Sequence, residues 1–119
     1  MPDFASEFGK VSDLVSGAAK GVLNKVDHFL FNALIGNLKS NDYEAVKVAV
    51  DQVVKEKKPV SIPPLYFVAH AHPIDRIREK ARSGLSAFDQ DKKIAELTAG
   101  KEIKEAVAAL IQEYGNYRG

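Results

Sequence analysis

The three histidines are the side chains of this chain best suited to acid–base or metal chemistry. His70 and His72 are two positions apart, and His28 comes much earlier. Residues two apart on a helix do not share a face, so this pair would not chelate a metal there, although a turn would bring the two rings closer. Neither an acidic cluster nor a His-x-x-x-His spacing accompanies them. We expect polar residues at a helix end and no metal site.

Nucleophilic and phosphate-binding chemistry lacks its usual motifs. The chain has no cysteine, hence no thiol nucleophile, disulfide or thiolate metal site. Its serines have neither a nucleophile-elbow nor a Ser-x-x-Lys context, and no glycine-rich phosphate loop occurs. We therefore expect a protein that is not an enzyme and that needs no cofactor.

Basic residues gather in the middle of the chain and suggest nucleic-acid binding as an alternative function. They are Lys55, Lys57, Lys58, Arg76, Arg78, Lys80, Arg82, Lys92 and Lys93. Acidic residues are interleaved with them and dilute their field, and the formal net charge is only +1. Ordinary solvated helix faces are favoured over a phosphate-binding patch.

Length and composition indicate one soluble globular domain. The chain has 119 residues, of which 45% are hydrophobic and 28% charged. Its acidic N-terminus lacks a basic leader, so we expect no signal peptide. The most apolar window, residues 22–38, contains Lys25, Asp27 and His28, so we expect no membrane span. These features favour a cytoplasmic location.

Helical periodicity dominates the sequence, and strand signals are poor. Apolar residues recur every three or four positions from Phe4 to Ala33, which predicts an amphipathic N-terminal helical segment. Glycines in this segment each cost roughly 1 kcal/mol against alanine, so a break is expected before Ala18. Phe4 and Phe8 lie on its glycine-flanked end and are candidate anchors for another chain.

Two stretches, residues 31–54 and 62–85, resemble each other at a spacing of 31 residues. Leu34 aligns with Leu65, Val46 with Ile77, Lys47 with Arg78, and Val54 with Leu85. A spacing of 31 residues is about 8.6 helical turns, so one continuous helix would put the copies out of phase. Each copy is therefore predicted to be a short helix, a tight turn and a longer helix.

Turn residues predict where these helices begin and end. Ser40, Asn41 and Asp42 offer side-chain oxygens for the start of a helix over residues 42–57, and Asn41 with Glu44 resembles a capping box. Pro59 ends this helix. Ser61 is expected to cap a short apolar helix. A further helix is expected from residue 74 or 75 to 88, and Gly100 divides the last helical segment, residues 92–114.

The second copy resembles a HEAT repeat of the short, phycobilisome-lyase-like variety. Pro63-Pro64-Leu65 opens its first helix, and Pro73-Ile-Asp-Arg-Ile-Arg-Glu-Lys-Ala81 opens its second. Residues 42–47 resemble the same start of a second helix, with lysine in place of arginine. This resemblance implies that Lys47 and Arg78 lie near the turns between helices and stabilise the stack by bonding to Asp75, to Glu44 or to carbonyls in the neighbouring repeat.

The expected architecture is an all-α, short α-solenoid of two to three HEAT-like helix pairs with an N-terminal amphipathic helical cap. The cap would cover residues 1–30, the first repeat 31–58, the second 59–88 and a partial third 89–114.

A protein of this architecture is expected to be a non-catalytic interaction or scaffolding module whose partner is another protein. The ridge of turns near residues 39–42, 70–76 and 98–101 is the expected binding surface. The candidate partner-binding residues are Phe4, Phe8, His70, His72, Arg76 and Arg82. A nucleic-acid-binding helical protein is the alternative, and a ligand-binding or enzymatic bundle is the third.

Overall fold

The regular structure of the described residues is entirely helical. The computed structural model describes residues 9–10, 36–38 and 40–114, apart from the side chain of Val60. It contains α3 (Tyr43–Glu56), a 3-10 helix η1 (Pro59–Ser61), α4 (Ile62–Ala71), α5 (Asp75–Ser86), α6 (Asp91–Thr98) and α7 (Ile103–Tyr114). The predicted all-α class is confirmed over these ranges. Apart from residues 9–10, the predicted cap over residues 1–30, with Phe4, Phe8 and His28, lies outside them.

Local side-chain chemistry determines where α3 begins, one residue later than the capping-box pattern suggested. Asp42 is the N-cap, because its backbone is extended and its Oδ1 accepts a hydrogen bond from the Glu44 backbone N–H at 3.1 Å. The prediction that Asn41 caps this helix is therefore wrong. The C-terminal end lies two residues before Pro59, where Lys57 turns into the left-handed region with φ of 50° and its N–H donates to the Val53 carbonyl at 2.9 Å.

The predicted role of Ser61 as a side-chain cap is also wrong. Its backbone is already helical and its side chain makes no capping hydrogen bond, because η1 leads the chain directly into α4. Pro63 and Pro64 lie in the first turn of α4, where a missing N–H costs nothing. Eight of the ten residues of α4 are buried, so this helix is surrounded by protein rather than exposed along one face.

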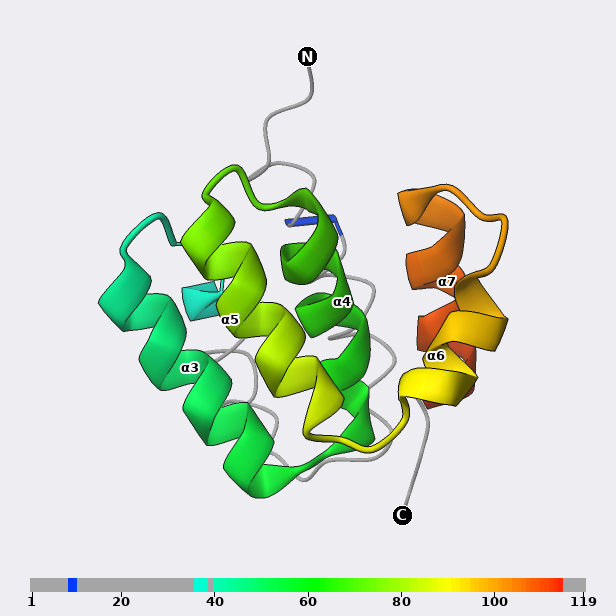
Figure 1. Ribbon diagram of the computed structural model, residues 1–119, viewed down its shortest axis with the longest axis horizontal. Coiled ribbons are helices and arrows are strands. Elements are labelled where there is room, and N and C mark those ends of the chain that lie inside the picture. The colour runs from blue at the N-terminus through cyan, green and yellow to red at the C-terminus, as the bar shows by residue number, and fades with distance from the viewer. Residues whose placement is uncertain (1–8, 11–35, 39, 115–119) are drawn as a thin grey trace.

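The helices are arranged with α4 near the centre. Figure 1 shows α3, α5, α4 and α7 side by side in that order, with α6 beside α7, and contacts between α3 and α5, α5 and α4, α4 and α7, and α7 and α6 agree with this order. The helices α3 and α5 lie side by side and in contact. In contrast, α7 packs mainly against α4.

The parallel helices α3 and α5 approach closely because α5 carries a glycine at the contact. A Cβ atom built on Gly84 would lie 2.5 Å from Val50 Cγ1 and 3.3 Å from Val54 Cγ2. Further up the same pair, Lys80 Nζ lies 2.6 Å from Asp51 Oδ1. The two helices are therefore packed along most of their lengths, with glycine required at the tightest point.

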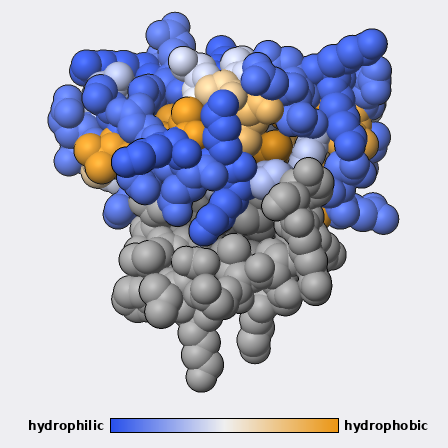
Figure 2. All heavy atoms as spheres, turned by 90° about the horizontal axis from the view of Figure 1, so that it is seen from below, coloured by the Kyte–Doolittle hydropathy of each residue, from blue (hydrophilic) through white to orange (hydrophobic). Residues whose placement is uncertain are grey.

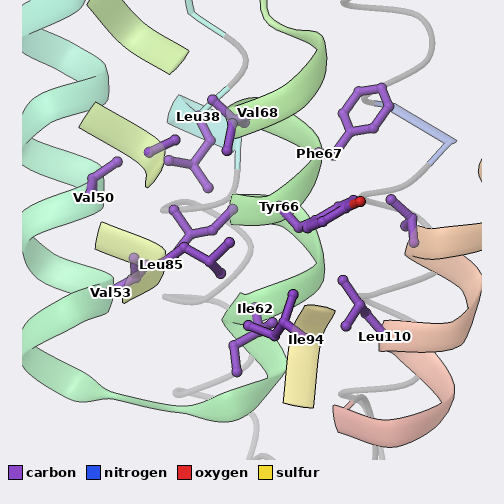
Figure 3. Packing of buried hydrophobic residues seen from close by; sticks show 14 of the residues in the cluster. Leu38, Val50, Val53, Ile62, Tyr66, Phe67, Val68, Leu85, Ile94 and Leu110 are labelled. Atoms are coloured by element: carbon purple, nitrogen blue, oxygen red, sulfur yellow. The ribbon is translucent and has the colours of Figure 1, made fainter. Parts of the chain in front are cut away.

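The core lies on both sides of α4. In Figure 3, Val50, Val53 and Leu85 lie on the α3 and α5 side, whereas Tyr66 points toward α7, which contributes Leu110. Leu65, Val68 and Leu110 are completely inaccessible to solvent. Burying a side chain of this size contributes about 1.5–3 kcal/mol, so this core is the main stabilising feature of the described region. No helix within the described ranges is long and apolar enough to cross a bilayer.

Candidate functional site

The turns that precede α3, α5 and α7 lie at one end of the molecule. Figure 1 shows all three at its upper end, where these three helices begin. We call this surface the turn edge and define it as residues 40–43, 70–76 and 98–102. The turns that were expected to form one ridge thus lie at the same end of the described helices.

His72 joins the first two of these turns. Its ring is completely buried, and its Nε2 lies 2.9 Å from the backbone carbonyl oxygen of Ser40, which is 32 positions earlier. The Ile74 backbone N–H donates to its Nδ1 at 3.0 Å. The turn before α3 and the turn before α5 are therefore tied together by one imidazole.

These two hydrogen bonds require the neutral ring with its proton on Nε2. Nδ1 must carry a lone pair to accept from Ile74, and Nε2 must carry the proton to donate to the Ser40 carbonyl. Desolvation by burial is the largest effect on His72 and lowers its pKa. The hydrogen bond to the Ser40 carbonyl favours the charged ring and offsets part of this decrease in pKa, whereas the positive charge of Arg78 adds to the decrease.

Arg78 holds the same turn from the α5 side. Its Nη1 donates to the His72 carbonyl oxygen at 2.5 Å, and its Nη2 pairs with the Asp75 carboxylate. The resemblance implied a bond to Asp75, which Arg78 makes, and bonds to carbonyls of the neighbouring repeat. The carbonyl that Arg78 contacts belongs instead to His72, in the turn just before its own helix. Lys47 instead pairs with Asp51 at 3.3 Å, so its expected pairing with Asp75 or Glu44 is wrong.

An exposed arginine lies over an aromatic ring beside this joint. The guanidinium carbon of Arg76 is 3.7 Å from the ring centroid of Tyr43, which places a cation from α5 on an aromatic residue of α3. Such a contact contributes about 0.5–1 kcal/mol at an exposed site. It also fixes the orientation of the guanidinium while Arg76 stays accessible.

A second aromatic contact lies near the end of α4. The ring of His70 is 4.2 Å from that of Tyr66, centroid to centroid, with 37° between the planes. Desolvation lowers the pKa of His70, and the charge of Arg82 lowers it further. Arg82 is exposed but lies six residues after Arg76, about 120° around α5, so the two arginines do not form one patch.

Four of the nine basic residues in the middle of the chain, Lys58, Arg78, Lys80 and Lys93, have acidic partners. Asp51 contacts both Lys80, at 2.6 Å, and Lys47, and the Lys80 hydrogen bond lowers the pKa of that carboxyl most strongly. Lys58 pairs with Glu56 at 3.6 Å and Lys93 with Glu113 at 2.5 Å. The interleaving of charges seen in the sequence is therefore local pairing in space, which weakens the case for a phosphate-binding face.

The predicted partner-binding residues within the described ranges differ in their exposure to solvent. His70, Arg76 and Arg82 are exposed, whereas His72 is buried and belongs to the framework beneath them. No group of three or more potential metal ligands occurs among the described residues. Tyr43 and Tyr66 were missed by sequence reasoning, because their helical spacing makes them look like ordinary core residues.

Comparisons with known proteins assign the chain to no family. No protein-family model matches the chain, and no significant match is found among curated proteins or solved structures.

Proposed function

We propose that this protein is a non-catalytic protein–protein interaction or scaffolding module that binds its partner at the turn edge. The observation that carries the proposal is the pair of fixed, accessible side chains there, Arg76 on Tyr43 and His70 on Tyr66. Arginine and aromatic residues are enriched at the energetic centres of protein interfaces. Because these side chains are already ordered by ring contacts, binding would cost less conformational entropy.

The HEAT-like organisation forms part of this proposal. Its support is that α3 and α5 are parallel neighbours whose turns are joined by His72. In proteins built from stacked helix pairs, residues in successive turns form a continuous surface. The partner in this proposal is another protein, and the cytoplasm is the proposed location.

Affinity purification from the native host with paired variants tests this function. We expect His70→Ala/Arg76→Ala to lose a specific protein that both the wild type and Lys55→Ala retain. Lys55 is an exposed cation in the last turn of α3, at the other end of that helix, and so controls for simple loss of charge. Equal recovery of the same proteins by all three chains would contradict the proposal.

Gel shifts at increasing salt concentration distinguish nucleic-acid binding from the proposed protein–protein interaction. The best variant is Arg76→Ala/Arg82→Ala, which leaves Arg78 in place because Arg78 supports the turn through the His72 carbonyl. A phosphate-binding face would give salt-dependent shifts that weaken in this variant. We expect no such shift, because much of the surrounding basic charge is paired.

A further inference from the structure

A cavity of about 350 Å³ lies at the end of the molecule opposite the turn edge. It is formed where α3, α5 and α7 end and where η1, α4 and α6 begin. Figure 2 looks onto this end and shows hydrophobic atoms framed by hydrophilic ones on the described part of the surface. Its volume falls within the range of small-molecule sites, about 300–1,000 Å³.

The walls of this cavity combine apolar and polar side chains. Pro59, Ile62 and Phe88 provide the apolar part. Gln90 and Tyr114 provide polar groups, and the Tyr114 hydroxyl donates to Gln90 Oε1 at 3.1 Å, which holds both in place. A ligand with an apolar body and a polar end matches such a lining.

The charge of the lining favours an anion. Two lysines, Lys57 and Lys93, face one acidic residue, Glu113, and Lys93 Nζ lies 2.5 Å from Glu113 Oε1. Lys57 has no ion pair within the described part of the chain, so its ammonium is the cation best placed to take a ligand carboxylate. A carboxylate bound by a lysine makes a charge-assisted hydrogen bond, stronger than a neutral one.

The backbone is unusual at the same place. Lys57, with φ of 50°, and Asp89, with φ of 57°, are the non-glycine residues with positive φ in the described ranges. Lys57 lines the cavity, and Asp89 precedes Gln90, which lines it as well. Non-glycine residues in the left-handed region carry a steric cost and are concentrated at functional sites. Here the left-handed turn at the end of α3 brings Lys57 to the cavity.

We propose that this cavity binds a small aromatic monocarboxylate, with its ring against Pro59 and Phe88 and its carboxylate on Lys57. The partly buried ring of Phe88 offers an aromatic surface, and aromatic pairs add to the effect of burial alone. This binding site lies at the opposite end of the molecule from the turn edge. Failure of the ligand to bind would therefore leave the proposed interaction function unaffected.

The test is an NMR titration of the full chain with 1-naphthylacetate and its neutral isostere 1-naphthylacetamide. We expect saturable shifts of the amides of Lys57, Ile62, Phe88, Gln90 and Lys93, and at least about tenfold weaker binding of the amide compound. Shifts that do not saturate, that lie elsewhere, or that are equal for the two compounds would overturn the proposal.

Lys57→Gly is the decisive variant because it separates binding from folding. Glycine adopts a positive φ without steric cost, so Tm should stay the same or rise while the affinity for 1-naphthylacetate falls at least about tenfold. Lys55→Ala, which removes a nearby cation that does not line the cavity, should bind like the wild type. Unchanged affinity in Lys57→Gly, or an equal loss in Lys55→Ala, would rule out the proposed site.

Discussion

At the residue scale, His72 shows how one polar side chain can join the turns that precede α3 and α5. Its ring is buried with both nitrogens hydrogen-bonded, one to Ser40 and one to Ile74. Protonating Nδ1 would break the bond from Ile74 and place a charge in the interior close to Arg78. The joint beneath the turn edge is therefore sensitive to pH.

The free energy of unfolding should decrease in mildly acidic solution. Burial lowers the pKa of His72 in the folded state from the ordinary value of 6.5, so below that pH the unfolded chain binds more protons. The contribution of His72 is fully present above pH 6.5 and is lost as the pH falls through 6.5 toward the folded pKa. Urea unfolding measured from pH 8 to pH 5 checks this.

Two variants test whether this pH dependence of stability comes from His72. His72→Asn keeps an acceptor for the Ile74 N–H but cannot titrate, so stability at pH 8 should fall by about 1–2 kcal/mol and the acid-dependent loss should shrink. His70→Gln removes a more exposed histidine whose pKa is also lowered, and it should leave the larger part of the acid effect in place. The same pH profile in wild type and His72→Asn would contradict the assignment.

At the scale of single elements, α3 depends on a local cap and on one close contact. Asp42 accepts from the Glu44 N–H, and the Ser40 hydroxyl in turn accepts from the Asp42 N–H at 2.9 Å. The same helix contacts α5 at Gly84, where a larger residue has no room.

Replacing the N-cap should destabilise the protein by a modest amount. Asp42→Ala leaves the Glu44 N–H without its side-chain acceptor, and we expect a loss of about 1 kcal/mol in the free energy of unfolding. Asn41→Ala should change stability by less than about 0.5 kcal/mol, because Asn41 is exposed and is not the cap. Chemical denaturation distinguishes the two, and a larger loss for Asn41→Ala would favour the capping box expected from the sequence.

Gly84→Ala should cost about 1–3 kcal/mol, because its Cβ would lie 2.5 Å from Val50 Cγ1 and the two helices would have to separate. Val50→Ala removes the clashing methyl groups. The double variant should therefore be more stable than the sum of the two single losses predicts, and a double-mutant cycle measures this coupling. Strict additivity would show that Val50 is not the obstacle.

At the scale of the whole molecule, the stability of the described region should be graded outward from α4. Nearly all of α4 is buried, whereas α6 buries only Ile94. Helices with few buried contacts open locally at a smaller free-energy cost than those in the core.

Hydrogen exchange should follow this gradient. We expect the amides of residues 66–71 in α4 to exchange only through global unfolding, and those of α6 to exchange faster through local opening. Leu65→Ala, which removes a fully buried side chain, should lower the free energy of unfolding by about 2–5 kcal/mol and speed exchange in α4. Equal protection of α6 and α4 in the wild type would contradict this order.

The sequence by itself determined the helical class and most helix boundaries of the described region. Gly100, with φ of 71°, divides α6 from α7 as expected, and the apolar residues at helical spacing in α3 face the core: Val46, Ala49, Val50 and Val53 are buried and Val54 is half-buried. These features follow from periodicity and turn chemistry, whose energies depend on neighbours only a few residues away. The same local signals were ambiguous between adjacent candidates, which is why Asn41 was predicted as the cap in place of Asp42.

Only the tertiary structure decided which residues are exposed to solvent and which distant residues are in contact. His70 and His72 are two positions apart, yet one is exposed and the other is sealed against Ser40. Lys57, Phe88 and Tyr114 line one cavity although they are far apart in the sequence, and α7 packs on α4. No local sequence pattern predicts the cavity or the packing of α7 on α4. Both depend on which helix faces bury the most surface together, and that energy comes from contacts between distant parts of the chain.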